Sequence, residues 1–172
     1  MNRQIQGLLF KRLVMPFCFF ICILHCNLAD AQEHPPKPIM VNVDTFQHLS
    51  FGSFIQNGNN GEVIVYANGG RTVTGSIILP TFFSTITPAL FEVKGIPGTL
   101  VTIVNGPNAE LWSSNGKKMI MQIGDSYPLS PFTIPNSEKI DVKIGGILFV
   151  RSLMDNPEGD YSGTFTVTFI QQ

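Results

Sequence analysis

The residues that could do chemistry in this chain are few and widely spaced. After residue 31 the sequence holds two histidines, His34 and His48, and no cysteine. A Ser-His-Asp triad needs a nucleophile placed beside its base, and no Gly-x-Ser-x-Gly nucleophile elbow is present. A zinc site needs about four convergent ligands, which two separated histidines do not supply. The sequence therefore predicts a protein that is not an enzyme, with no catalytic residue, metal or other cofactor.

One short segment gathers acidic oxygens. Asp155-Asn156-Pro157-Glu158-Gly159-Asp160 carries three carboxylates and an amide. Calcium prefers such oxygen ligands, although the spacing differs from that of an EF-hand loop. The Pro-x-Gly step already accounts for a turn here. We interpret the segment as a turn, and calcium binding is left as an open alternative.

The aromatic residues offer a further possibility. Trp112 is the only tryptophan, and with Tyr66 and Tyr127 it could form a platform on which a sugar ring stacks. A single tryptophan in a β-sandwich is more often part of the core, which is the interpretation we favour. Glycan contact through Trp112 is the alternative. Tyr161 is expected to make a corner contact in which its hydroxyl ties a loop to a neighbouring strand.

The N-terminal segment indicates the compartment. Basic residues precede an apolar run from Leu13 to Leu24, and Ala29-Asp30-Ala31 has the pattern of a cleavage site. This order is typical of a secretory signal peptide over residues 1–31, cut before Gln32. The apolar run is shorter than the roughly 20 residues that span a membrane, so we expect no integral span in the mature chain. The protein is predicted to be exported to the periplasm, the cell surface or the medium.

The remaining residues indicate strands and turns. Residues 32–38 form a proline-rich extended leader, because proline lacks a backbone donor. Beyond it, apolar and polar residues alternate with period two, as in 139–144 and 164–169, and Asn-Gly turn signals separate the alternating segments. A strand is also expected over Leu49–Phe54, directly after His48. We predict one domain over residues 39–172, an antiparallel β-sandwich of immunoglobulin-like, Greek-key type with about eight to ten strands, a barrel being the alternative.

Four stretches resemble a known family. They are Leu49–Phe54, Gly61–Leu79, Phe91–Gly98 and Gly159–Thr168, the last with a Gly-x-Tyr-x-Gly-x-Phe-x-Val pattern. Their order and spacing resemble the bacterial domain of unknown function 4402, small exported all-β domains similar in pattern to spore-coat-U-like and fimbrial subunit domains. The resemblance covers about residues 39–170 and implies a bacterial surface protein with no assigned catalytic residues. Unlike fimbrial subunits, the sequence has no cysteine after residue 31 and no long alternating donor segment at the N-terminus of the mature chain.

Partners follow from charge and from the first strand. The formal net charge is −1 and no run of lysines and arginines occurs, so nucleic acid is not expected as a partner. Ile39, Val41 and Val43 alternate directly after the leader. They form either an ordinary first strand or a strand that pairs with the open edge of a neighbouring subunit, and the same logic applies to residues 163–170.

The expected function is therefore structural or adhesive. We expect a non-enzymatic surface or periplasmic protein, a fimbria-like subunit that pairs with itself or a related subunit through an edge strand. The alternative is a monomeric extracellular module that binds a glycan or a protein, with Trp112 or the 56–61 loop at the contact.

Overall fold

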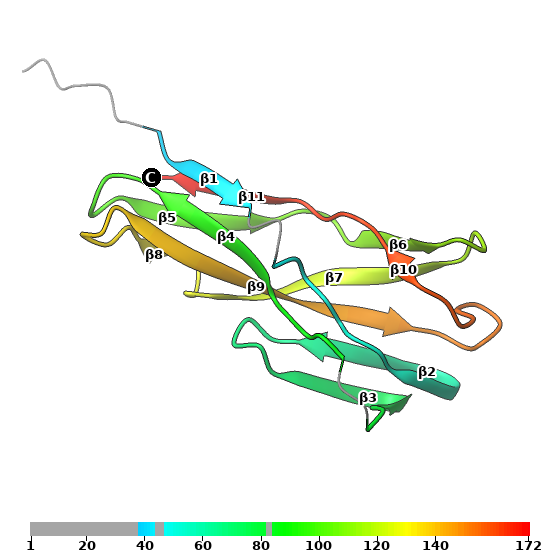
Figure 1. The fold of residues 1–172 in the computed structure, drawn as a ribbon. Helices are drawn as coiled ribbons and strands as arrows, with labels where there is room; N and C mark the ends of the chain where they lie inside the picture. The colour runs from blue at the N-terminus through cyan, green and yellow to red at the C-terminus, as the bar shows by residue number, and fades with distance from the viewer. Residues whose placement is uncertain (1–37, 44–46, 82–83) are drawn as a thin grey trace, which may run out of the picture. The chain divides into compact units, whose positions relative to one another are not determined.

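The computed structural model describes residues 38–43, 47–81 and 84–172, and every regular element in these ranges is a β-strand (Figure 1). The predicted signal peptide and most of the leader lie outside the described residues. Within the described ranges no helix is long and apolar enough to cross a membrane. The strands in chain order are β1 (Met40–Val43), β2 (Ile55–Val65), β3 (Arg71–Ile78), β4 (Ala89–Lys94), β5 (Leu100–Asn105), β6 (Ala109–Ser113), β7 (Lys118–Tyr127), β8 (Phe132–Thr133), β9 (Lys139–Val150), β10 (Tyr161–Ser162) and β11 (Val167–Gln171).

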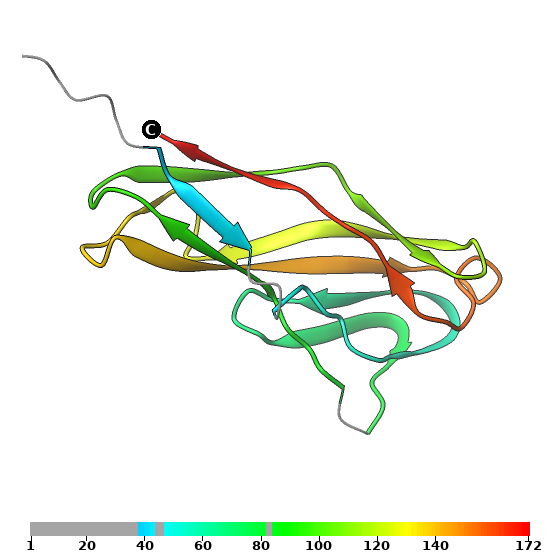
Figure 2. The same ribbon diagram turned by 45° about the horizontal axis from the view of Figure 1, so that its top comes forward.

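The strands form two antiparallel sheets, which confirms the predicted all-β sandwich (Figure 2). The large sheet has the order β1-β4-β9-β7-β6-β10, and the small sheet has the order β11-β5-β8. Strand β9 is the axis of the large sheet. On one edge its residues 139–144 pair with β4 and its residues 146–150 pair with β2, while β7 pairs along the other edge. Strand β3 is joined to the sheet through β2.

Two core clusters lie along β9. The first, which we call the closed half, is covered by the small sheet and contains Ala89, Phe91, Val93, Val101, Ile123, Phe132, Ile134, Val142 and Ile144. The second, which we call the open half, contains Phe51, Val63, Val65, Ile77, Ala109, Met119, Met121, Leu148 and Val150. Leu49, Phe54, Tyr161 and Phe165 pack against the open half, and none of them lies in a strand of the small sheet. Leu49 and Phe165 also pack against the closed half.

The two halves meet at a glycine pair. Register in the β7–β9 ladder shifts between Ile123 and Ser126, opposite Gly145 and Gly146. A side chain at Gly146 would press against Leu49, with its Cβ 2.8 Å from that residue's Cδ2. This Gly-Gly step thus permits the chain around Leu49 to approach β9 closely.

Candidate functional site

The predicted strand-pairing residues lie at one edge of the large sheet. Within the chain, β1 pairs with β4 in antiparallel register, with Val41 opposite Val93. No other described strand pairs with β1. Met40 and Val41 are 60% and 38% exposed, whereas Ile39 packs against the closed half and its N–H donates to Gln171 Oε1 at 3.2 Å. Segment 39–43 is therefore a first strand of its own chain, and pairing with a neighbouring chain stays a prediction.

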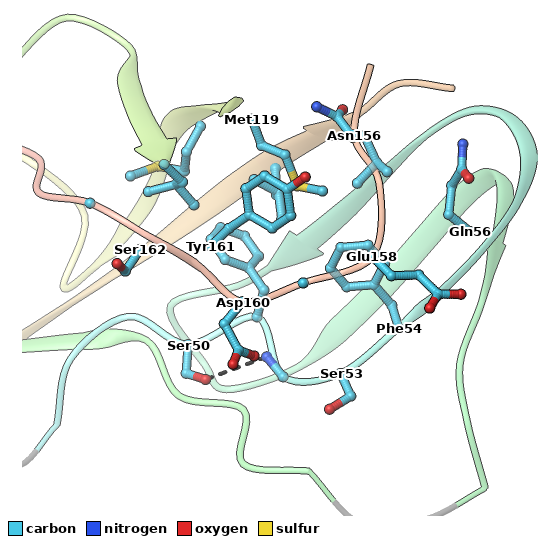
Figure 3. Close-up of a pocket in the computed structure, with 18 of the residues that line it drawn as sticks. Ser50, Ser53, Phe54, Gln56, Met119, Asn156, Glu158, Asp160, Tyr161 and Ser162 are labelled. Carbon is cyan, nitrogen blue, oxygen red and sulfur yellow. Dashed lines mark hydrogen bonds between the residues drawn. The ribbon is translucent and has the colours of Figure 1, made fainter. Parts of the chain in front are cut away.

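A groove of about 840 Å³ opens over the open half (Figure 3). One wall is the chain from residue 48 to 56, and the other runs from 156 to 165. Ser50, Ser53, Glu158 and Asp160 bring polar groups to this part of the molecule (Figure 3). The sheet contributes apolar side chains to the lining, namely Leu111, Met119, Met121, Leu148 and Val150.

The first wall is held mainly by contacts with side chains. The strand expected over Leu49–Phe54 is extended chain with a single bridge, in which the Ser50 N–H donates to the Thr87 carbonyl at 2.8 Å. Arg71 Nη1 donates to the carbonyl oxygens of Phe51 at 2.9 Å and Ser53 at 3.0 Å. Burial lowers the pKa of Arg71 from its ordinary value. Arg71 thereby fixes the wall to β3.

The second wall is held by a tyrosine and a buried amide. Tyr161 donates its hydroxyl to the Pro157 carbonyl at 2.8 Å, and burial raises the pKa of this phenol. The expected tyrosine corner is present, but it closes its own loop and does not reach a neighbouring strand. Asn156 is buried. Its Oδ1 accepts from Arg151 N at 2.6 Å and its Nδ2 donates to the Lys118 carbonyl at 2.8 Å.

Neither wall pairs with the other across the groove. The first wall pairs outward through Ser50, and β10 pairs outward with Ser113 and Trp112 of β6. Among the described residues, no backbone hydrogen bond joins 49–55 to 157–165. The layer that covers the open half is therefore interrupted between the extended first wall and the second wall, which is a turn followed by β10. Such an arrangement offers an apolar floor and main-chain groups to an added strand.

The acidic loop has a structural role. Asp155 accepts a hydrogen bond from the Ser152 hydroxyl at 3.2 Å. The Asn156 amide oxygen, which would be a calcium ligand, is already used by the backbone N–H of Arg151. No group of three or more potential metal-ligating side chains occurs within 38–43, 47–81 and 84–172. The geometry accordingly favours the interpretation of this segment as a turn.

Trp112 is not a core residue, so that expectation was wrong. It is 49% exposed on the outer face of β6, and Lys118 Nζ lies 5.3 Å from the centre of its ring. Alternation along β6 explains this, because Ala109 and Ser113 are buried while Glu110 and Trp112 are exposed. The Ala-Glu-Leu-Trp-Ser pattern was visible in the sequence and could have corrected the expectation.

The other aromatic and histidine candidates lie elsewhere. Tyr66 and Tyr127 are exposed. Neither lines the shallow hollow on the sheet surface that Trp112 lines, so the three residues form no common platform there. His48 lines the groove, and its carbonyl accepts from the Thr87 hydroxyl at 2.7 Å. His34 lies outside the described residues.

Comparison with known proteins gives one match. The family model described as a domain of unknown function, DUF4402, matches residues 41–170. No curated protein and no solved structure matches the chain.

Proposed function

The chain belongs to the DUF4402 family, and we propose that it is a non-enzymatic, exported structural or adhesive protein, a fimbria-like subunit that assembles by edge-strand pairing. The observation that carries this proposal is the groove of the open half. Its first wall is extended chain, its second wall is a turn that leads into strand β10, its sheet side is apolar, and no described strand closes it.

The mouth of the groove supports its role as an acceptor. Ile55 and Leu153 line the groove and are exposed, and Met154, next to Leu153 in the chain, is exposed as well. Large apolar side chains gathered around an opening are typical of a surface that a partner covers. An added strand would gain main-chain hydrogen bonds from the walls and would place alternate side chains on the apolar floor.

The segment proposed as donor is residues 39–43 of a neighbouring copy. It follows a proline-rich leader, it pairs with one strand only, and its apolar residues Ile39, Val41 and Val43 recur at every second position. That spacing matches a strand with one face on an apolar surface. Because donor and acceptor are different surfaces, such pairing is head-to-tail and extends a filament when its rotation does not close a ring.

Export is part of the same proposal. The segment 1–31 has the pattern of a signal peptide, and all three cysteines fall within it. Expression of the full chain with its signal in a bacterial host is expected to release a protein that begins at Gln32. Intact-mass measurement of the extracytoplasmic fraction tests this, and retention of residues 1–31 would contradict it.

Light scattering on two forms of the protein tests the assembly. Residues 32–172 are expected to form multimers whose mass rises with concentration. Residues 45–172, which lack the donor, are expected to be monomeric and to bind an added peptide of residues 32–43. The same peptide carrying Val41→Asp is the matched control and should not bind. If both forms are stable monomers and neither peptide binds, strand pairing is wrong, and the alternative of a monomeric module for a glycan or protein ligand takes its place.

A further inference from the structure

A second surface lies on the outer face of the large sheet, and it shares only Met119 and Asn156 with the lining of the groove. Trp112 of β6 stands directly opposite Lys118 of β7 in the ladder. Arg151 follows β9 at the same end of the sheet and lines the same open basin, which has a volume of about 480 Å³. The remaining lining residues are Gly116, Lys117, Met119, Ile120, Phe149, Asp155 and Asn156.

The basin is held in shape by the buried amide of Asn156. This side chain joins the backbone of Arg151 to the carbonyl of Lys118, the residue that faces Trp112. The turn on the other side is fixed as well, because Lys117 N donates to Asn115 Oδ1 at 2.9 Å. Groups that are ordered before binding lose little further entropy when a ligand arrives.

The groups around the basin are those that a sugar requires. The indole of Trp112 is a flat apolar surface, half exposed, and can pack against the C–H face of a pyranose ring. Arg151 and Lys117 are donors, and neither takes part in the three ion pairs among the described residues. Asp155 supplies an acceptor. Sugar hydroxyls both donate and accept, so they need this mixture.

We propose that this basin binds a glycan, with one pyranose ring stacked on Trp112 and its hydroxyls bonded to Arg151 and Asp155. A protein partner fits less well, because the centres of protein interfaces are depleted of charge, whereas cations and a carboxylate surround the single exposed indole here. The three proposed contacts, Trp112, Arg151 and Asp155, neither line the groove nor belong to the donor strand, so an assembled subunit and a monomer could both carry the site.

Intrinsic fluorescence reports directly on the site, because Trp112 is the only tryptophan in the chain. Residues 32–172 would be titrated with four probes: cellohexaose, mannohexaose, the hexamer of N-acetylglucosamine, and hexagalacturonate. We expect a saturable change with at least one probe. Saturation with a neutral hexamer identifies a neutral glycan, and saturation with hexagalacturonate alone identifies an acidic one.

Variants measured by calorimetry then assign the contacts. Trp112→Ala is expected to weaken binding about tenfold or more, as truncation of a stacked tryptophan does at other binding sites, and Trp112→Phe should recover part of the loss. Arg151→Gln is expected to weaken binding about threefold to tenfold. Lys143→Gln is the matched control, because it removes a positive charge from β9 outside the basin, and should leave the affinity unchanged.

Three outcomes would overturn the proposal. They are the absence of any saturable change with all four probes, equal affinity of the parent chain and Trp112→Ala, and equal weakening by Lys143→Gln and Arg151→Gln, which would indicate attraction by bulk charge. Thermal unfolding is the control for folding. Trp112→Ala should melt close to the parent chain, since an exposed tryptophan contributes little to the core. A mass measurement on the same samples separates this result from the strand-pairing test.

Discussion

The two halves of the sandwich share β9 and differ in what covers it. Over residues 139–144 the cover is the small sheet, whose central strand β5 is paired with β8 and β11. Over residues 146–150 the cover is two segments that form almost no ladder. They are held by the Arg71 guanidinium, the Ser50–Thr87 bridge and the Tyr161 hydroxyl.

This difference indicates where the molecule can accept a new strand. Inserting a strand into the closed half would require an existing ladder to break. Inserting one into the open half would displace no backbone pairing between the two walls, because none is present among the described residues. Regions with few regular backbone bonds also open at lower free energy than core strands. The open half is thus the part of the sandwich suited to exchange.

The largest expected effect comes from shortening one buried side chain of β9 in each half of the sandwich. Ile144 and Leu148 lie on the same face of β9 and are 1% and 3% exposed. We expect Ile144→Ala to cost about 4 kcal/mol and Leu148→Ala about 2 kcal/mol, because a closed site cannot collapse or admit water as readily as one beside a groove. Urea unfolding of residues 32–172 measures both, and equal costs would show that the two halves are equally well packed.

The next effect concerns the first wall of the groove. Gly52 has φ of +67°, and a Cβ there would lie 2.6 Å from Ser84 Oγ and 2.9 Å from Arg71 Nη1. Gly52→Ala is expected to cost about 2 kcal/mol, since an L side chain disfavours this backbone region and the neighbours must shift. Gly98→Ala, at φ +85° with open space around it, is the control for backbone strain alone.

The location of the damage distinguishes a local effect from a general one. Hydrogen exchange should rise in residues 49–54 of Gly52→Ala and stay unchanged in β5 and β11. Uniform acceleration across both halves would contradict the separate attachment of the wall.

A smaller effect is expected in the second wall. Tyr161→Phe keeps the ring that packs against the open half and removes the hydroxyl that donates to Pro157. The loss should be about 1 kcal/mol, the usual net value of one such hydrogen bond. Thermal unfolding measures it, and a variant as stable as the parent chain would show that the corner contact does not hold the wall.

The closed half could be predicted from the sequence more fully than the open half. Alternation over 139–144 predicts the face of β9 that is buried, and the structure confirms it. Near the open half, the same rule predicts a strand from residue 163, whereas β11 begins at Val167. At Gly163 the chain passes so close to the Glu110 carbonyl that a side chain would collide with it. Alternation is a property of one strand alone. The close approach at Gly163 depends on β6, which is distant in the sequence, so alternation could not predict it.

The groove could not be predicted for a similar reason. Period-two patterns indicate that Leu49–Phe54 has a buried face, but they do not indicate whether its backbone finds a partner. Here one bridge forms, and the remaining support comes from Arg71, which lies on another strand, 18 residues after Ser53 in the sequence. The exposure of Trp112, in contrast, could have been predicted, because the alternation of residues along β6 already indicates that its side chain points outward.

The smallest expected effect concerns the ion pairs that Glu92 makes on the outer surface of the closed half, away from its core. Glu92 on β4 lies 2.7 Å from Lys94 Nζ and 3.0 Å from Lys139 Nζ, and hydrogen bonds to these two lysines lower the pKa of its carboxyl to about 2. A carboxyl whose folded pKa lies below its ordinary value of 4.5 stabilises the fold above that value. This stabilisation is lost as the pH falls from about 4.5 towards 2.

Melting temperatures of Glu92→Gln and the parent chain should therefore differ most near neutral pH and converge in that window. Both ion pairs lie at the surface, so 1 M NaCl should reduce the difference. A difference that is constant with pH would assign the role of Glu92 to packing and leave the acid response of the sandwich to other groups.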